Sequence, residues 1–389
     1  MSVLLSCLSK LSSLKTPALV VSFSSLLSNG FVFCNTLILL LMSVIVTTQR
    51  HLTACSFSTS VLENTFPCVI AGAQRCGSTL RDGDIGNLKR YTHIIFETNI
   101  VTKKKVPMKL VEEMGTVGAS NGWVATLEEG IVCLQDDLNP SASDVDPKRI
   151  YLPPLVTLPH CQTQVVTNVA MSSPSPEDED CVVAVKFLGP QLSLCRPARS
   201  SEWTNIRITD PGFFNSRVMY SKRDEMFSMP ASRGTYIGSW NIGEPQVIQQ
   251  LRYQDCPELV HSKWVSLDSS CRSEHLVESR PTGETFLVKW YNRLYARNIM
   301  MRVLRLPRFM VFKIDEEGNA QFTSDIGDLC IFLSEAEPFC VRASLCQQDH
   351  FSNCLFVLGR DYRGHGSLTL GHDGLGFANM GTYHVPYYI

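Results

Sequence analysis

The sequence predicts an all-β protein, because its last two-thirds are successive strand–turn–strand segments with almost no helical periodicity between them. The turns are short and use glycine, proline, asparagine or aspartate. Five hairpins are expected here: Val182–Phe187 with Gln191–Arg196, Val218–Tyr220 with Met226–Met229, Leu276–Ser279 with Glu284–Tyr291, Phe309–Ile314 with Ala320–Thr323, and Cys330–Leu333 with Phe339–Arg342. In such a body, function is expected in loops and on one face of the strands.

The segment before these hairpins shows the same pattern. Gly122–Leu134 is predicted to be a strand pair that turns at Glu128–Gly130. Ser172–Asp180 is a low-complexity acidic stretch between two strands, and we interpret it as a mobile surface insertion. The short basic stretch Lys103–Lys105, with Lys109, lacks interleaved aromatic residues and is expected to be a solvated loop.

Aromatic residues close several strands at irregular intervals, and they are Trp203, Trp240, Trp290 and Phe322. A β-propeller places aromatic residues between blades that recur at about 40–50 residues. The length of the body allows six or seven such blades. The alternative is a β-sandwich, which would need two or three stacked copies to use the same length.

Composition sets limits on function. The chain has 389 residues, 44% of them hydrophobic and 19% charged, which is typical of a globular protein with a buried core. A formal net charge of −2 gives no reason to expect nucleic acid or an anionic membrane surface as a partner. The 15 cysteines form no CxxC pair and are scattered, so we expect small buried side chains in a reducing compartment.

Residues 1–60 have the composition of a targeting segment. No acidic residue precedes Glu63, and serine occurs 13 times in the first 60 positions. A serine-rich, acid-poor start with an amphipathic stripe is typical of an organellar transit peptide, and Ser56–Ser60 resembles the end of a plant mitochondrial presequence. We therefore expect a mitochondrial protein, with import into chloroplasts as the alternative.

One stretch departs from this pattern. Phe31–Val46 is a nearly unbroken apolar run, close to the length of a membrane span or a signal-peptide core. Phenylalanine, leucine, valine and serine are also what a uridine-rich plant intron encodes when it is translated. Our hypothesis is that Thr16–Gln49 is a retained intron, and a real anchor or signal is the alternative.

Several stretches resemble the plant-specific KIB-type β-propeller family, also known as domain of unknown function 295 (DUF295). The similar stretches are Gly122–Thr126, Cys181–Gly189, Arg217–Trp240, His275–Ser279, Phe309–Asp315, Ile326–Phe332 and Asn353–Phe356. The resemblance implies a propeller over residues 61–389. It is closest to the organelle-targeted branch, since the leader takes the place of the F-box found in many relatives. In the F-box branch, the propeller is thought to receive substrates for a ubiquitin ligase.

A local motif resembles a nucleotide-phosphate loop. Gly72-Ala-Gln-Arg-Cys-Gly-Ser-Thr79 is similar to the sulfotransferase version, with Arg75 as the basic group and Ser78 and Thr79 on the phosphate. Such a loop must open a helix whose N-terminus faces the anion. Gly83 and Gly86 oppose a helix there, so we interpret this segment as the first strand and turn of the body.

A second motif has the spacing of a CCCH zinc finger, with Cys330, Cys340, Cys346 and His350 as the donors. The intervening apolar residues predict buried strands, which favours a propeller blade over a finger. Weaker candidates are His365, His372 and Asp373 in glycine-rich turns, and the adjacent carboxylates Asp136–Asp137 and Glu316–Glu317. Neighbouring residues on a strand point to opposite faces, so neither carboxylate pair suits acid–base catalysis.

The sequence therefore predicts a non-catalytic protein-interaction module of a plant organelle. It assigns no catalytic residue, no cofactor and no metal, and its partner is expected to be an unidentified organellar protein. A ubiquitin-ligase substrate receptor is the first alternative, and a sulfotransferase-like enzyme that uses Gly72–Thr79 is the second.

Overall fold

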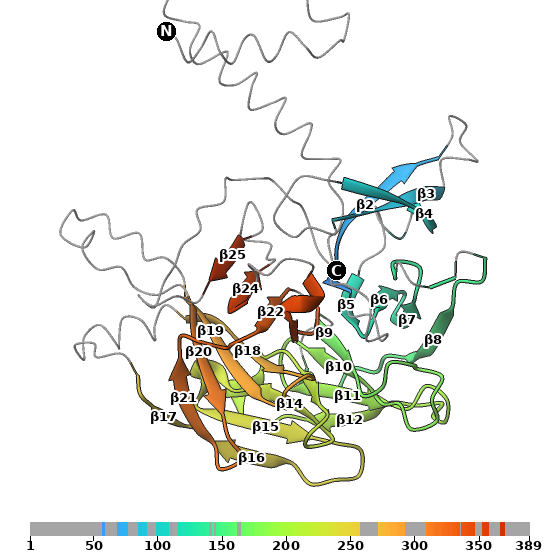
Figure 1. Cartoon of the computed structure of the whole chain (residues 1–389). Coiled ribbons are helices and arrows are strands. Elements are labelled where there is room, and N and C mark those ends of the chain that lie inside the picture. The colour runs from blue at the N-terminus through green and yellow to red at the C-terminus, as the bar shows by residue number, and fades with distance from the viewer. Residues whose placement is uncertain are drawn as a thin grey trace, which may run out of the picture. The chain divides into compact units, whose positions relative to one another are not determined.

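The computed structural model describes residues 57–58, 68–76, 85–91, 99–108, 110, 116–139, 142–143, 145–161, 165–256, 271–291, 309–334, 336–346, 352–357 and 366–369. Within these ranges, the named elements are β-strands and short 3-10 turns, and the strands form six sheets (Figure 1). An all-β fold is thus confirmed for the described part of the chain.

The first three sheets are antiparallel, and each uses four strands in chain order. Sheet one contains β1 (Phe57–Ser58), β2 (Cys68–Arg75), β3 (Ile85–Tyr91) and β4 (Asn99–Pro107). Sheet two contains β5 (Thr116–Ser120), β6 (Trp123–Glu128), β7 (Ile131–Gln135) and β8 (Arg149–Pro154). Sheet three contains β9 (Val166–Met171), β10 (Val183–Phe187), β11 (Gln191–Cys195) and β12 (Thr204–Arg207).

Sheet four has the same simple strand order, with β13 (Met219–Ser221), β14 (Met226–Pro230), β15 (Tyr236–Trp240) and β16 (Val247–Gln250). The last two sheets depart from this order. Sheet five contains β18 (Cys271–Glu278), β19 (Thr285–Tyr291), β20 (Phe309–Ile314) and β21 (Asn319–Thr323), and β17 (Arg252–Gln254) adds a parallel edge strand beside β21. Sheet six has the order β23 (Phe339–Arg342), β22 (Leu329–Leu333), β24 (Cys354–Val357) and β25 (Gly366–Thr369), and β22 is parallel to β24.

Strand β10 shows how the sheets pack. All five of its residues are buried, and successive side chains point to opposite faces. Val183 and Val185 belong to a hydrophobic core with residues of sheet two, whereas Ala184 belongs to a core with Phe227 and Trp240 of sheet four. A sheet that is buried on both faces between two other sheets is not the half-solvated sheet of a sandwich.

The same pattern repeats along the chain. Five separate cores contain residues of consecutive sheets: one and two, two and three, three and four, four and five, and five and six. At one edge of the sheets, β5 contacts β9, β9 contacts β13, β13 contacts β18, and β18 contacts β23. These strands line the centre, as the inner strands of a β-propeller do. The predicted propeller is therefore confirmed, with six sheets as blades among the described residues.

The hairpin predictions are also confirmed. All five expected pairs are strands in antiparallel register, and their bounds differ from the predicted ones by only a few residues. The predicted turn at Glu128–Gly130 is present, with Glu129 and Gly130 at positive φ values of 51° and 80°. Trp240 packs edge-on against Phe213 with ring centroids 5.4 Å apart, and buried Trp203 donates its indole N–H to the Pro153 carbonyl at 2.7 Å.

Of the two loop predictions, one is wrong and the other is confirmed in part. Lys103–Lys105 lies in β4, and the buried Lys104 ammonium donates to the Ala142 carbonyl at 3.0 Å, because a lysine can be buried where backbone oxygens receive its hydrogen bonds. The acidic stretch Ser172–Asp180 does connect two strands, β9 and β10. The surface loop is therefore confirmed, and its mobility stays a prediction. The Trp123 indole N–H donates to the Pro174 carbonyl at 2.9 Å, and Arg199 forms an ion pair with Glu179.

The predicted leader, the division at residue 60 and the proposed intron Thr16–Gln49 concern a segment that lies almost wholly outside the described residues, and they stay predictions. The same holds for the apolar run Phe31–Val46. Within the described ranges, no helix is both long and apolar enough to span a membrane.

A close approach between two inner strands provides a test of the fold. A Cβ atom added at Gly118 of β5 would lie 2.6 Å from the Val169 backbone nitrogen of β9. Since backbone cannot yield as a flexible side chain can, Gly118→Ala should lower the free energy of unfolding by about 1–3 kcal/mol. Urea denaturation followed by tryptophan fluorescence measures this loss.

Gly130 provides the control, because an added Cβ there meets no atom within 4 Å. Gly130→Ala should therefore cost only the strain of a positive φ, about 1 kcal/mol. Equal stability of Gly118→Ala and the parent protein would contradict the close packing of β5 on β9.

Candidate functional site

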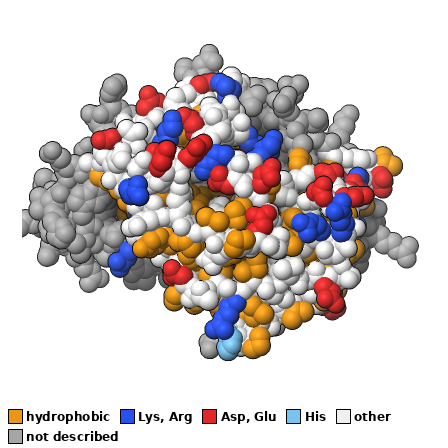
Figure 2. Space-filling view, turned by 90° about the horizontal axis from the view of Figure 1, so that it is seen from below, with side chains coloured by type: hydrophobic (Ala, Val, Ile, Leu, Met, Phe, Trp, Pro, Cys, Tyr) orange, Lys and Arg blue, Asp and Glu red, His pale blue; other side chains and the backbone are white. Residues whose placement is uncertain are grey.

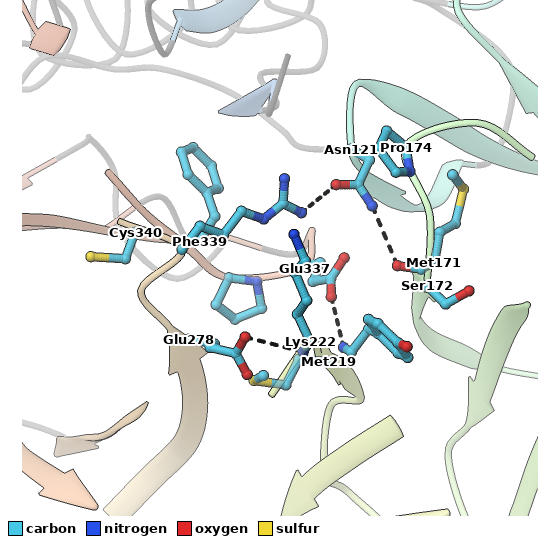
Figure 3. A pocket seen from close by; sticks show the side chains of 13 residues that line it. Asn121, Met171, Ser172, Pro174, Met219, Lys222, Glu278, Glu337, Phe339 and Cys340 are labelled. Carbon is cyan, nitrogen blue, oxygen red and sulfur yellow. Dashed lines mark hydrogen bonds between the residues drawn. The ribbon is translucent and has the colours of Figure 1, made fainter. Parts of the chain in front are cut away.

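A cavity of about 130 Å³ lies where the inner strands end (Figure 3). β5, β9, β13 and β18 end at Ser120, Met171, Ser221 and Glu278, beside the segment that leads into β23. Residues of sheets two to six line the cavity, which makes it a shared feature of five blades. We call it the central pocket.

The Asn121–Gly122 turn shapes one side of the pocket. Both residues have positive φ values, 52° and 83°, which an Asn-Gly pair adopts readily in a tight hairpin. The turn directs the Asn121 amide to the Met171 carbonyl of sheet three at 3.3 Å, and its Oδ1 accepts a hydrogen bond from Arg280 of sheet five (Figure 3). One side chain thereby connects three sheets.

Glu337, in the connection between β22 and β23, makes the most contacts across the pocket. Its Oε2 accepts a hydrogen bond from the Ser120 hydroxyl at 2.5 Å, and its Oε1 accepts one from the Tyr220 backbone N–H at 2.9 Å. Its own backbone N–H donates to the Ala119 carbonyl at 2.9 Å. Glu337 therefore joins sheet six to sheets two and four.

Burial raises the pKa of Glu337 from 4.5 to about 7. The hydrogen bonds from Ser120 and Tyr220 and the charge of Arg280 oppose this shift, whereas the nearby Glu278 carboxylate adds to it. Near neutral pH the pocket therefore contains a carboxyl group that is close to half-protonated.

Glu278 makes the corresponding contacts between sheets five and four. Its two carboxylate oxygens accept the Ser221 hydroxyl at 2.7 Å and the Lys222 backbone N–H at 3.0 Å. The Lys222 side chain is exposed and lines the pocket, as Figure 3 shows. Its ammonium group donates no hydrogen bond to another described residue.

The size and lining of the pocket limit what it can hold. Sites for drug-sized ligands span roughly 300–1,000 Å³, well above the volume found here. The apolar part of the lining includes Met171, Met219 and Phe339, and the polar part includes two cations and two carboxylates. Such a space fits one side chain of another molecule. On the face shown in Figure 2, acidic and basic side chains are interspersed.

The predicted phosphate-loop motif is not a loop in its first half. Gly72 and Arg75 lie in β2 and pair with Lys89 and Gly86 of β3. The next described segment after the motif is strand β3, whereas an anion loop requires the N-terminus of a helix. The alternative interpretation of the motif as the first strand of the body is confirmed for Cys68–Arg75. Ser78 and Thr79 lie outside the described residues.

The zinc-finger spacing brings no donor set together in the described residues. Cys330 pairs with Val341, and Ile331 pairs with Cys340, so the two cysteines point to opposite faces of sheet six. Cys346 ends a 3-10 turn, and His350 lies outside the described residues, as do His365, His372 and Asp373. No group of three or more potential metal ligands occurs where the structure describes side chains.

The adjacent carboxylates have separate structural contacts. Asp137 is buried and accepts two hydrogen bonds from the Arg149 guanidinium, at 3.0 and 2.8 Å, whereas Asp136 accepts the Lys148 backbone N–H at 2.8 Å. Glu316–Glu317 lies in the exposed turn between β20 and β21, where Asp315 accepts hydrogen bonds from Asn319. The first pair therefore stabilises the segment that connects β7 to β8, and the second pair occupies an exposed turn that Asp315 stabilises.

Three buried thiols agree with the expected role of the cysteines as small apolar residues. Burial raises the pKa values of Cys133 and Cys181 to about 11 and that of Cys195 to about 12. A thiol needs its thiolate form to react, so these three groups are chemically inert at neutral pH.

Sequence patterns did not identify the central pocket. The Asn121–Gly122 and Arg280–Gly283 turns carry a local signal, but nothing local indicates that they meet. Glu337 sits in an ordinary connection between two strands. Only the order of the blades around the centre brings these residues together.

The chain belongs to the KIB1-4 beta-propeller family, which its residues 95–384 match. This finding confirms the resemblance to the KIB-type family, whereas the assignment to its organelle-targeted branch stays a prediction. No curated protein matches the sequence.

The solved structures to which the chain is similar have different names. A catalytically inactive virginiamycin B lyase from Staphylococcus aureus, with quinupristin, has 11% identity and a TM-score of 0.35, and the match covers 69% of each chain. Raptor from Chaetomium thermophilum has 12% identity and a TM-score of 0.33, over 67% of this chain and 20% of that one. The Cps50 (Swd1) propeller domain of Myceliophteria thermophila has 9% identity and a TM-score of 0.33, over 70% and 90%. Similarity this low says nothing about activity.

The carboxyl group of Glu337 generates a pH-dependent prediction. Its pKa in the folded protein lies above the unfolded value of 4.5, so its contribution to stability is complete below about pH 4.5 and is lost as the pH rises through 7. Between these two pH values, the free energy of unfolding of the parent protein should fall by roughly 2–4 kcal/mol relative to that of Glu337→Gln, which cannot titrate at this position. Urea midpoints of both proteins between pH 5 and pH 8 test this, and parallel profiles would contradict it.

Proposed function

We propose that the protein is a non-catalytic interaction module, and that the central pocket receives a side chain of a partner protein. The observation that carries the proposal is the pocket itself. Its volume of about 130 Å³ suits one side chain, and its lining joins apolar residues to charged ones, as in the core and rim of protein interfaces. Membership of a β-propeller family supports the same conclusion, because propellers present loops from many blades at one end.

The proposal includes the cellular setting. A serine-rich, acid-poor leader supports import into a plant mitochondrion, with the chloroplast as the alternative, and the partner is then a protein of that organelle. The competing role is that of a substrate receptor for a ubiquitin ligase, as in the F-box branch of similar propellers. That role requires an adaptor-binding segment, and the sequence shows no F-box pattern.

Site-directed photo-crosslinking tests the pocket as the interaction site. A photoreactive amino acid at position 174, an exposed residue that lines the pocket, should crosslink one specific protein in tissue extracts. The same group at position 145, where Val145 is 95% exposed away from the pocket, provides the matched control. Equal crosslinking from both positions would contradict the proposed site.

Fractionation of the same tissue tests the setting. Affinity capture of the tagged full-length protein should recover it from mitochondria, with an N-terminus near Ser56–Val61 and organellar proteins bound. Recovery from the cytosol with an intact N-terminus and bound ligase adaptors would instead support the receptor role.

A further inference from the structure

The polar side chains of the central pocket differ in whether they have hydrogen-bond partners within the protein, and this difference indicates the chemistry of the occupant. The hydrogen-bond acceptors among these side chains bind donors of the protein itself. The Glu278 and Glu337 carboxylates each receive two hydrogen bonds from neighbouring sheets, and the Asn121 carbonyl oxygen receives one from Arg280. These acceptor side chains therefore already have hydrogen-bond partners within the protein.

The cationic donors, by contrast, are largely without partners among the described residues. Lys222 contributes an ammonium group with three N–H donors, because its hydrogen bond to Glu278 is donated by the backbone N–H and not by the side chain. Arg280 has five guanidinium donors, and one recorded hydrogen bond joins its Nη2 to Asn121. A partner group that enters this space meets donors that carry positive charge.

We infer that the central pocket binds a carboxylate side chain, Asp or Glu, from an acidic segment of the partner protein, with Lys222 as its main contact and Arg280 beside it. The inference rests on the proposed function and names the chemistry of the partner. Met171, Met219 and Phe339 would contact the methylene groups and the apolar neighbours of that side chain. Charge-assisted hydrogen bonds are stronger than neutral ones, which makes the carboxylate the better occupant than an amide.

The two carboxyl groups of the pocket oppose the binding of an anion. Glu278 and Glu337 both line the pocket, and each repels a negative charge when it is ionised. The other charged and titratable residues that line the pocket are Arg280 and Glu278 of sheet five, Lys222 and Tyr220 of sheet four, and Cys340 of sheet six. Protonation of Glu337 removes one repulsive charge, so binding should strengthen as the pH falls from 8 to 6.

A selection from random peptides displayed on phage, with the full-length protein as bait, tests the inference. Selected peptides should share one acidic position next to apolar residues. Lys222→Met should abolish that acidic preference, and it leaves the backbone N–H that contacts Glu278 in place. Arg207→Met, which removes a positive charge from exposed β12, should leave the preference unchanged.

Synthetic peptides then define the charge. Binding of the glutamate peptide should be roughly tenfold tighter than that of its glutamine counterpart, and the difference should vanish in Lys222→Met. Equal affinities in the parent protein, or an acidic preference that survives Lys222→Met, would overturn the inference while leaving the interaction module standing. Tighter binding of a phosphoserine peptide would overturn the assignment to a carboxylate. Selection of no peptide at all would count against the proposed function itself.

Discussion

The side chain of Glu337 makes the contacts on which the centre of the molecule depends. It belongs to the connection between β22 and β23, and it receives hydrogen bonds from Ser120 of sheet two and Tyr220 of sheet four. Ser120 in turn accepts the Met171 N–H of sheet three at 3.1 Å. A short series of polar contacts thus connects four sheets where their inner strands meet. Because the carboxyl group is partly buried and shielded from water, each of these hydrogen bonds is stronger than it would be in solvent.

Around this centre, stability comes from apolar faces packed between consecutive sheets. A strand such as β10 is buried on both sides, and burying one Val, Leu or Phe side chain stabilises a fold by about 1.5–3 kcal/mol. The cores between sheets are separate from one another, so each blade depends on its two neighbours. The polar centre adds little apolar burial, but it fixes how the inner ends of the strands meet. That arrangement leaves a small pocket with positively charged donors.

Most of the fold could be predicted from the sequence, but little of the site could. Hairpins such as Val182–Phe187 with Gln191–Arg196 could be predicted, because alternating apolar residues and a Gly-Pro turn are local signals. The burial of Lys104 could not, since it depends on the Ala142 carbonyl, 38 residues away. The pocket is less local still: Ser120 and Glu337 are 217 residues apart, and each is an ordinary polar residue in its own segment. The pairing of β22 with β24 in parallel was also missed, since adjacent strands are expected to form antiparallel hairpins.

The central claim is that a partner protein places an acidic side chain in the central pocket. A structure of the full-length protein bound to its captured partner tests this most directly. The account predicts an Asp or Glu carboxylate of the partner within hydrogen-bond distance of the Lys222 ammonium, between Met219 and Phe339. A partner bound to the outer strands of the sheets, with the central pocket left empty, would contradict it.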